Sequence, residues 1–471
     1  MPLAIYAASL NHAPAYWDTG EAQTVPWIFG IMHPTGFPAF TLIGGLFAHV
    51  FAIGPVSWRM GFFSALAASG AAWLVARMCC EFAPFPWIAA ASAWVFAFGE
   101  IAWVRATRAE VHTLALFFAM LAVFAAVRWY RSGDARMLVG GALAWGLGLA
   151  THPITALLAP AFALLFFARL RTATVRGVAL ALLALICGLA LYAYLPVRSE
   201  IVTARRLDPT RSLGLPPGRA FWDNNHPAAW DGFKREVTGA DFGAGGAFRE
   251  MVDPQIYAAQ GPVFFMELLH EITPLCALLA LGGLAALLRR DRWLAIALFL
   301  AFAGPTAFAF AFRIEADPDR YYLISFAISM VLAGYGAAAI ARALPAFRRI
   351  LAALLAVMAI ALIVINRSTF DQPYGSDAQA VIDTVVEKTP DNAVLIAPWL
   401  YATPLAYAAY VEHRLGHRIL DCSWLADDAP MVPIWMKTRP VYVVGQLFGQ
   451  VPGYRAVRIQ ASGDLFKVIK R

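Results

Sequence analysis

Long apolar stretches separated by short polar junctions dominate the chain. Apolar runs of 16 or more residues recur from Gly61 to Ile365. A helix needs about 20 apolar residues to cross a bilayer, so the pattern predicts a polytopic helical membrane protein. We expect about ten complete spans, at residues 60–77, 86–104, 111–128, 137–151, 153–168, 177–196, 263–288, 293–312, 321–342 and 350–366.

Two shorter apolar segments do not fit a complete span. Met1–Leu10 is too short to cross a membrane, and we interpret it as the end of a first helix that begins outside this sequence. Phe37–Ile53 follows a proline-containing turn and ends at Gly54-Pro55. We expect it to form a helix at the outer interface, because counting it as a span would invert every later helix.

Arginine clusters predict the orientation of these helices. Thirteen arginines fall at every second junction, whereas the alternate short junctions carry few. By the positive-inside rule, the arginine-rich junctions are cytoplasmic. The net charge of +7 is therefore a topology signal and gives no support for nucleic-acid binding. The clusters are Arg77, Arg128/Arg131/Arg136, Arg169/Arg171/Arg176, Arg289/Arg290/Arg292 and Arg342/Arg348/Arg349.

The composition supports the same class of protein. Hydrophobic residues make up 60% of the chain and charged residues only 14%, which excludes an ordinary soluble globular protein. Five cysteines in mostly apolar positions indicate no disulfide framework. Frequent Ala, Arg and Gly suggest high-GC bacterial coding, which predicts an inner-membrane protein whose outer side faces the periplasm.

The domain organisation follows from the polar segments. Residues 1–366 form the predicted transmembrane domain, with outer loops at 11–59 and 198–262, and residues 369–471 form an extracytoplasmic domain. The tail alternates helical and strand patterns, so we expect a small α/β domain. Its predicted elements are helices at Ala378–Lys388 and Leu400–Leu415 and strands at Ala393–Ala397, Arg418–Asp421 and Val441–Val444. The fold class is an all-α polytopic membrane protein with a small C-terminal α/β domain.

Ionisable residues gather at the predicted outer ends of the helices, while the middles of the spans are almost free of charge. A transporter or lipid flippase, the alternative function, usually carries charges near the midplane. A scaffold that binds partners through its outer tail is a third possibility. A catalytic site at the outer surface fits the pattern best. The residues concerned are Asp18, Glu21, His33, Glu100, Glu110, His112, His152, Arg198, Asp317, Asp319 and Arg320.

These residue types suit transfer of a sugar from a lipid phosphate. The sequence has no P-loop, dinucleotide-binding glycine motif, zinc-protease motif or serine-hydrolase elbow. A carboxylate can take the proton from an acceptor hydroxyl as that hydroxyl attacks the anomeric carbon. Arginine or histidine can stabilise the charge that grows on the departing phosphate.

Several motifs resemble those of the glycosyltransferase-C superfamily, and in particular its protein-O-mannosyltransferase-like branch, which includes enzymes acting on plexin-type domains. "WDTGE" (Trp17–Glu21) is similar to the first outer-loop acidic motif of that branch. "GIMHPTGFP" (Gly30–Pro38) resembles its His-Pro-x-Gly-Tyr-Pro motif, with Thr35 and Phe37 replacing Pro and Tyr. The resemblance is strong over about residues 10–250 and weak beyond them.

Three further stretches continue this ordered set. "RAEVHTL" (Arg108–Leu114) resembles an Ala-Glu-Val-Tyr motif in which His112 replaces the tyrosine. "GLGLATHPI" (Gly146–Ile154) resembles the next outward turn, and "YLPVRS" (Tyr194–Ser199) the entry to the large loop. The resemblance implies a polyprenyl-phosphate sugar donor, possible use of mannose, an outward-facing site and inverting transfer to a hydroxyl on a protein, glycan or lipid.

The resemblance also implies roles for Asp18 and Glu110, and the two hydrogen bonds that a guanidinium can make to phosphate suggest roles for Arg198 and Arg320. Each role has a simpler structural alternative. Asp18 matches the catalytic base but could cap a helix. Glu110 could instead stabilise the start of a helix through the helix dipole, or pair with Arg108. Arg198 and Arg320 could simply extend their charged groups to the membrane interface. Asp317 and Asp319 make at most a weak Ca²⁺ site, so we expect no metal and no cofactor. The expected catalytic residues are Asp18, Glu21 and Glu110, and the expected substrate-binding residues are His33, His112, His152, Arg198, Arg320 and Tyr321.

Overall fold

The computed structural model describes residues 1–312, 318–370, 376–459 and 464–471. Contacts between residues divide the chain into two compact units. The first comprises Met1–Ser9, Ser64–Tyr192 and Gly239–Gln372, and the second comprises Leu10–Phe63, Ala193–Thr238 and Pro373–Arg471. The second unit thus combines most of the two predicted outer loops with the C-terminal tail. The expected division into domains 1–366 and 369–471 stays a prediction.

The described secondary-structure elements of the first unit are α-helices and 3-10 turns. Alanine, leucine and phenylalanine fill these segments, and few helix-breaking residues interrupt them. Its α-helices are α1 (Pro2–Ala8), most of α4 (Val56–Phe82), α5 (Pro86–Phe98), α6 (Glu100–Ala106), α7 (Val111–Ser132), α8 (Ala135–Thr151), α9 (Ala159–Ala168), α10 (Val175–Leu189), α13 (Ala244–Glu250), α14 (Pro254–Ile272), α15 (Pro274–Arg290), α16 (Arg292–Ala311), α17 (Leu323–Ala343) and α18 (Arg348–Phe370). Short 3-10 turns include η1 (Pro153–Leu158), η2 (Leu170–Thr172), η5 (Ala240–Phe242), η6 (Pro318–Tyr322) and η7 (Pro345–Phe347).

The ten predicted spans correspond to long apolar helices, bent pairs of helices and shorter apolar helices. Among the described residues, 6 helical stretches are long and apolar enough to cross a membrane, or up to 8 if each of two bent pairs counts as one span. The predicted spans at 137–151 and 153–168 fall on shorter apolar helices, Ala135–Thr151 and Pro153–Ala168. The helical fold class is confirmed, whereas length and composition support fewer spans than ten.

Two predicted spans, 86–104 and 263–288, are not straight helices. α5 and α6 meet at 73°, and α14 and α15 meet at 103°. Thr273 precedes Pro274, whose ring disfavours a helical residue before it, and Thr273 adopts a φ of 72°. At the other bend, the Glu271 carboxylate accepts hydrogen bonds from the backbone N–H groups of Ile101 (2.8 Å) and Ala102 (2.9 Å). That carboxylate supplies partners for two donors that the start of α6 leaves unpaired.

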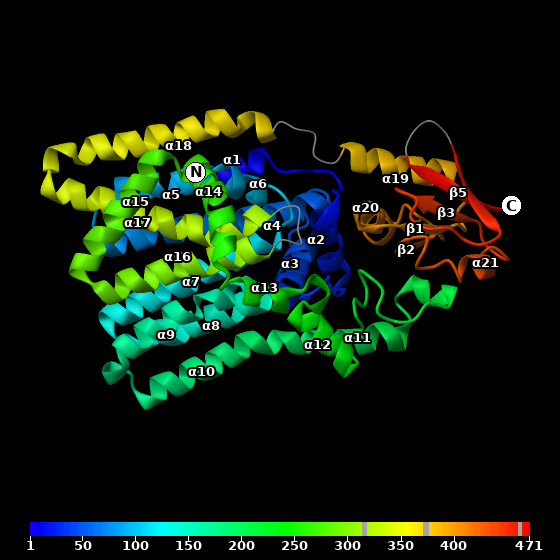
Figure 1. Cartoon of the computed structure of the whole chain (residues 1–471), viewed down its shortest axis with the longest axis horizontal. Helices are drawn as coiled ribbons and strands as arrows, with labels where there is room; N and C mark the ends of the chain where they lie inside the picture. Colours follow the sequence, from blue (N-terminus) through cyan, green and yellow to red (C-terminus); the bar gives the residue numbers. More distant parts are fainter. Residues whose placement is uncertain (313–317, 371–375, 460–463) are drawn as a thin grey trace. The chain divides into compact units, whose positions relative to one another are not determined.

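Close backbone contacts join pairs of helices in this unit. α7, α8 and α10 lie side by side, and α15 packs along α17 (Figure 1). In the second pair, Gly283 and Gly336 face each other. A Cβ on Gly283 would overlap the carbonyl oxygen of Leu332 and would lie 2.9 Å from the Gly336 nitrogen. Small residues at this crossing therefore allow the backbones to touch.

The crossing of α15 and α17 gives a matched test of this packing. We expect Gly283→Ala to lower the free energy of unfolding by about 1–3 kcal/mol, because the added methyl group cannot fit without moving α17. Gly282→Ala is the control, since a Cβ at Gly282 would meet nothing within 4 Å. Alanine there should leave stability unchanged or raise it through better helix propensity. Thermal unfolding of the purified chain in detergent measures both, and equal losses would contradict the packing argument.

The second unit contains the remaining helices and the sheet. Its helices are α2 (Trp17–Ile28), α3 (Pro38–Val50), α11 (Tyr194–Arg205), η4 (Pro209–Leu213), α12 (Trp230–Thr238), α19 (Ser376–Lys388), α20 (Trp399–Tyr410) and α21 (Val432–Trp435). Its strands are β1 (Val394–Ala397), β2 (Ile419–Cys422), β3 (Val441–Val444), β4 (Tyr454–Arg458) and β5 (Leu465–Lys470). η3 (Ala190–Ala193) lies at the boundary between the two units.

The strands form one five-stranded sheet in the order β2-β1-β3-β5-β4 (Figure 1). β1 pairs in parallel with β2 and β3, while β5 pairs antiparallel with β3 and β4. The predicted small α/β fold of the tail is confirmed. Sequence reasoning missed β4 and β5. β4 is an exposed edge strand with Arg455 and Arg458 along it and lacks a clear apolar pattern.

The core of this α/β fold includes residues from the large loop. Leu213 and Leu215 pack with buried residues of β1, β2 and β3. The indole N–H of Trp435 donates to the Leu213 carbonyl oxygen at 2.8 Å. The segment around residue 213 is therefore part of the folded core, even though it lies more than a hundred residues before the tail in sequence.

Asp421 in β2 and Asp428, which follows β2 in sequence, both bind Arg219 of the same loop. Arg219 lies 3.6 Å from Asp421 and 3.4 Å from Asp428, measured from guanidinium nitrogen to carboxylate oxygen. The Ser423 hydroxyl donates to Asp421 at 2.9 Å and also contacts Asp428. Burial and the adjacent Asp428 raise the pKa of Asp421 to about 8, while Arg219 and Ser423 act in the opposite direction.

This raised pKa predicts a pH dependence of stability. Between the ordinary value of 3.8 and about 8, the folded chain holds a proton on Asp421 that the unfolded chain releases. Stability should therefore fall as the pH rises through that range, by on the order of 1 kcal/mol per pH unit at most. Melting temperatures measured from pH 5 to pH 8 should show a shallower decline for Asp421→Asn.

The matched control is Asp231→Asn, because the Asp231 side chain is 91% exposed. It should keep the pH dependence of the wild type. If the melting temperature of Asp421→Asn falls with pH as steeply as that of the wild type, the proton is not held on Asp421.

Candidate functional site

Asp18 and Glu21 lie in the first two turns of α2. Their spacing of three residues puts both carboxylates on one side of the helix, as the sequence predicts. Glu21 is fully buried, while Asp18 is only half-buried. The two carboxylates therefore occupy different environments although they share one helix.

The Glu21 carboxylate holds the loop that contains His33. It accepts a hydrogen bond from the His33 backbone N–H at 2.7 Å, and it also pairs with the His33 ring through Nδ1. Burial raises the pKa of Glu21, although His33 opposes this shift. Both of its oxygens are thus engaged with His33, which fixes the Gly30–Pro38 motif against α2.

The backbone of this motif fits closely against residues of the large loop. A Cβ on Gly30 would overlap the carbonyl oxygen of Phe221, so a side chain cannot be accommodated there. The Tyr194 hydroxyl donates to the Gly30 carbonyl at 3.0 Å. Two motifs that are far apart in sequence, around residues 30 and 194, are therefore joined within this unit.

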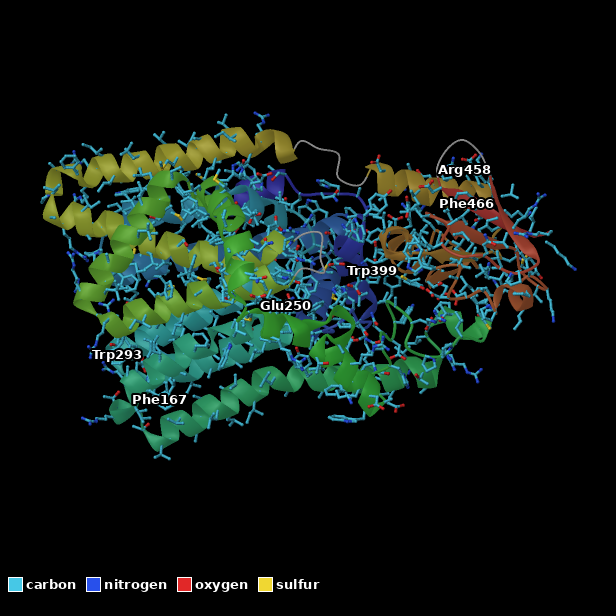
Figure 2. All side chains as sticks on the ribbon, in the orientation of Figure 1. Phe167, Glu250, Trp293, Trp399, Arg458 and Phe466 are labelled. Carbon is cyan, nitrogen blue, oxygen red and sulfur yellow. The ribbon has the colours of Figure 1, made fainter. Side chains whose placement is uncertain are left out.

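Asp18 has a partner that sequence reasoning missed. The indole N–H of Trp399 donates to Asp18 Oδ1 at 3.0 Å. Trp399, labelled in Figure 2, is the first residue of α20 in the C-terminal segment. It follows β1 at the carboxyl end of a parallel strand, where ligand-binding residues commonly lie in α/β folds. That position was the one available signal.

Arg198 also lies in this unit, on α11. Its Nη2 donates to the Ile28 carbonyl oxygen at the end of α2, at 2.9 Å, and its guanidinium lies 5.9 Å from the centroid of the Trp222 ring. Its buried Nε has no hydrogen-bond partner among the described residues. Arg198 thus supports the loop after α2 and keeps an N–H group available for another acceptor.

Glu110 organises a second group of site residues, in the helical unit. It is the N-cap of α7, and its carboxylate accepts hydrogen bonds from the His112 backbone N–H (3.2 Å) and ring Nδ1 (2.8 Å). Arg105 and Arg108 approach the same carboxylate to 3.4 Å and 3.7 Å. Glu110 therefore performs the capping and pairing roles that the simpler structural reading predicts.

Aromatic rings and cations surround this cap. The rings of His112 and His152 are 4.4 Å apart between centroids, and Tyr321 packs edge-on to His112 at 5.1 Å. The Arg320 guanidinium lies 5.7 Å from the Tyr321 ring. Arg105, which is almost fully buried and also pairs with Asp319, is a member of this cluster that the sequence-based site did not include.

The predicted site residues thus fall into two clusters. Asp18, Glu21, His33 and Arg198 belong to the second unit, and Glu110, His112, His152, Arg320 and Tyr321 belong to the first. The expectation that all of them face one cleft stays a prediction. No group of three or more metal-ligating residues occurs in the part of the chain that the structure describes, and Asp317 lies outside the described residues.

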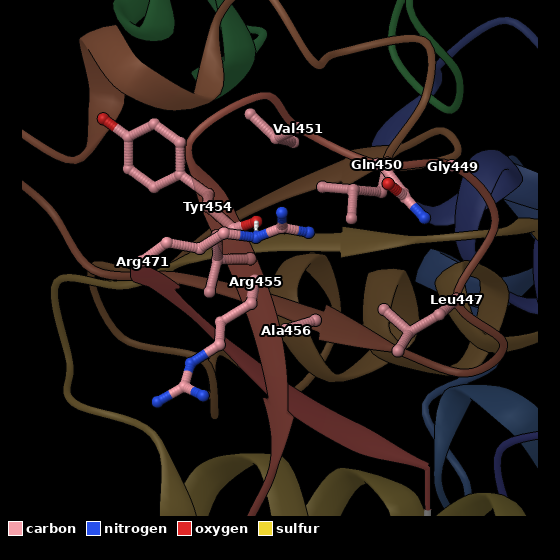
Figure 3. A pocket seen from close by; sticks show the side chains of 10 residues that line it. Leu447, Gly449, Gln450, Val451, Tyr454, Arg455, Ala456 and Arg471 are labelled. Atoms are coloured by element: carbon pink, nitrogen blue, oxygen red, sulfur yellow. Dashed lines mark hydrogen bonds between the residues drawn. The ribbon is translucent and has the colours of Figure 1, made fainter.

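A pocket of about 320 Å³ lies elsewhere in the C-terminal fold (Figure 3). Gln450, Tyr454, Arg455 and Arg471 contribute its polar lining, and Arg471 Nε donates to the Tyr454 carbonyl at 3.1 Å. The residues that line it include none of the predicted site residues. It therefore adds no chemistry to either cluster.

Sequence comparisons point to one group of proteins. Residues 18–176 match the family described as the Protein O-mannosyl-transferase TMEM260 N-terminal domain. Protein O-mannosyl-transferase TMEM260 of Mus musculus is 26% identical over 361 residues, which cover 71% of this chain and 48% of that protein. The protein of the same name from Dictyostelium discoideum is 28% identical over 128 residues, covering 27% of this chain and 16% of that protein. The chain thus spans less than half the length of these relatives.

Solved structures support the fold. ArnT from Cupriavidus metallidurans bound to undecaprenyl phosphate matches with a TM-score of 0.58 and 11% sequence identity, over 99% of this chain and 96% of that chain. The apo state of the same protein matches over the same shares of the two chains, with a TM-score of 0.55 and 11% identity. The chain is therefore an integral membrane protein with a glycosyltransferase-C-like fold, similar to protein O-mannosyl-transferases.

Proposed function

We propose that this chain is a membrane glycosyltransferase that moves a sugar, with mannose the first choice, from a polyprenyl phosphate to an acceptor hydroxyl. The arrangement of Asp18, Glu21 and His33 carries the proposal. A half-buried carboxylate stands one turn from a fully buried one that is already occupied by histidine. The protein thereby separates a carboxylate that can react from one that holds the structure.

Asp18 is the general base in this mechanism. Its carboxylate accepts the proton of the acceptor hydroxyl while the hydroxyl oxygen attacks the anomeric carbon. The bond between that carbon and the lipid phosphate breaks as the new glycosidic bond forms, so the configuration inverts. Glu21 acts indirectly, by holding His33 and the loop after α2. Asp18 is thus the single catalytic carboxylate of the first cluster.

Cations stabilise the departing polyprenyl phosphate. Arg198 offers its buried Nε–H, and a guanidinium can bind a phosphate through two hydrogen bonds. The separate cluster around Glu110, in the helical unit, also carries positive charge, on Arg105, Arg108 and Arg320. His33 in the second unit, and His112, His152 and Tyr321 in the first, are proposed substrate contacts within their own units. The lipid tail of the donor stays in the membrane.

The comparisons support this substrate class. The relatives are called protein O-mannosyl-transferases, which favours mannose and a protein hydroxyl. The matching ArnT structure holds undecaprenyl phosphate, which favours a polyprenyl-phosphate donor. The arginine distribution along the sequence favours reaction on the non-cytoplasmic side, at the periplasmic face of a bacterial inner membrane.

Asp18→Asn tests the base. The purified full chain in proteoliposomes would be given undecaprenyl-phosphate mannose with a labelled sugar and a pool of peptides rich in Ser and Thr. We expect label transfer to fall by about 10²–10⁴-fold, because an amide cannot accept the proton. Asp231→Asn is the exposed control and should retain full transfer. Near-normal transfer by well-folded Asp18→Asn would remove Asp18 as the base.

Arg198→Lys tests the phosphate site without requiring an acceptor. We expect the affinity for undecaprenyl phosphate to fall about tenfold, because an ammonium group keeps the charge and loses the planar fork of donors. Arg205→Lys, an exposed position on the same helix, serves as the control. Binding measured on the chain in nanodiscs should separate the two variants. Equal affinity in both would exclude Arg198 from the donor site.

A further inference from the structure

The C-terminal helix α20 is tied to the segment that carries Asp18. A Cβ on Gly20 would lie 3.0 Å from the Cβ of Thr403, so α2 and α20 touch closely at this point. The Tyr407 hydroxyl accepts a hydrogen bond from the Ser57 backbone N–H at 3.0 Å. These contacts fix the position of α20 along two parts of the N-terminal segment.

Trp399 lies at the start of this fixed helix and meets three other elements. Its ring stacks on Phe221 at 5.7 Å with an angle of 10°, and the His33 ring meets it edge-on at 5.7 Å. Its indole N–H points to Asp18 Oδ1. Stacking on Phe221 restricts the ring, so the donor is held in place before any substrate binds.

We infer that Trp399 is a positioning residue for Asp18, so that the C-terminal α/β fold completes the catalytic site. This inference rests on the proposed function, because it gives Asp18 the role of base. The indole N–H bonds Asp18 Oδ1 and so sets the orientation of the carboxylate that receives the proton of the acceptor. Helix α20 therefore contributes a residue to the site.

The same hydrogen bond favours the ionised form of Asp18. A donor that bonds a carboxylate stabilises its charge, whereas nearby negative charge opposes it. Glu21, on the same helix, is a titratable group whose charge interacts with that of Asp18, and His33 meets the Trp399 ring. Removing the indole N–H should therefore make the base protonate at a higher pH, with the ring contacts unchanged.

The first of two variants replaces the N–H group and preserves the fused ring. Benzothienylalanine at position 399 has a sulfur in place of the indole N–H, and Trp399→Phe is a second variant that uses ordinary residues. With undecaprenyl-phosphate mannose and the peptide pool, we expect kcat/KM to fall about tenfold. The acid limb of its pH profile should move up by about one pH unit. Trp424→Phe is the control within the same fold, where the ring packs on Phe448.

The outcomes separate the inference from the proposed function. If Asp18→Asn abolishes transfer and the two Trp399 variants keep both the rate and the pH profile of the wild type, the positioning role is wrong while the proposed function stands. If Asp18→Asn keeps its transfer activity, Asp18 is not the base and the inference falls with that role. If the wild-type chain transfers no sugar, the proposed function itself fails. A lower rate with an unshifted pH profile in both Trp399 variants would indicate a structural role only, and would also overturn the inference.

Discussion

The buried Glu21 carboxylate is the constraint on which the N-terminal part of the second unit depends. A carboxylate that is removed from water must be paired and hydrogen-bonded, or it will take up a proton. His33 meets this need with its backbone N–H and its ring, and it can do so only if the loop after α2 folds back. The resulting loop brings Gly30 against Phe221, and Asp18, one turn away, is the more exposed of the two acids. In the proposed mechanism, Glu21 therefore supports the structure and Asp18 is the carboxylate that reacts.

Long-range contacts extend this arrangement to the tail. Trp399 reaches Asp18 across 381 positions of sequence, and Leu213 enters the core of the C-terminal sheet. The loops and the tail thus form one unit, which explains why a polar α/β segment accompanies a largely apolar chain. In the helical unit, the Glu110 carboxylate likewise pairs with His112, Arg105 and Arg108 at the start of α7.

The sequence predicted the parts of this fold that depend on local patterns. Apolar runs identified the helices, and alternation in the tail identified β1, β2 and β3. Local patterns could not reveal the bends at Gly99 and Thr273, because the partner that supports α6 is Glu271, far along the chain. The motifs similarly identified Asp18, Glu21 and His33 as neighbours. They missed Trp399 and Arg105, because a tryptophan after a strand and an arginine at a helix end look ordinary until tertiary contacts are known.

The central claim is that Asp18 faces the reacting carbon of a lipid-linked sugar. An experimental structure of the full chain with a non-transferable analogue of undecaprenyl-phosphate mannose tests this most directly. The account predicts the anomeric carbon opposite the Asp18 carboxylate, with room for one hydroxyl between them, and the phosphate at Arg198. Sugar density bound away from Asp18, or on the cytoplasmic side of the membrane, would contradict it.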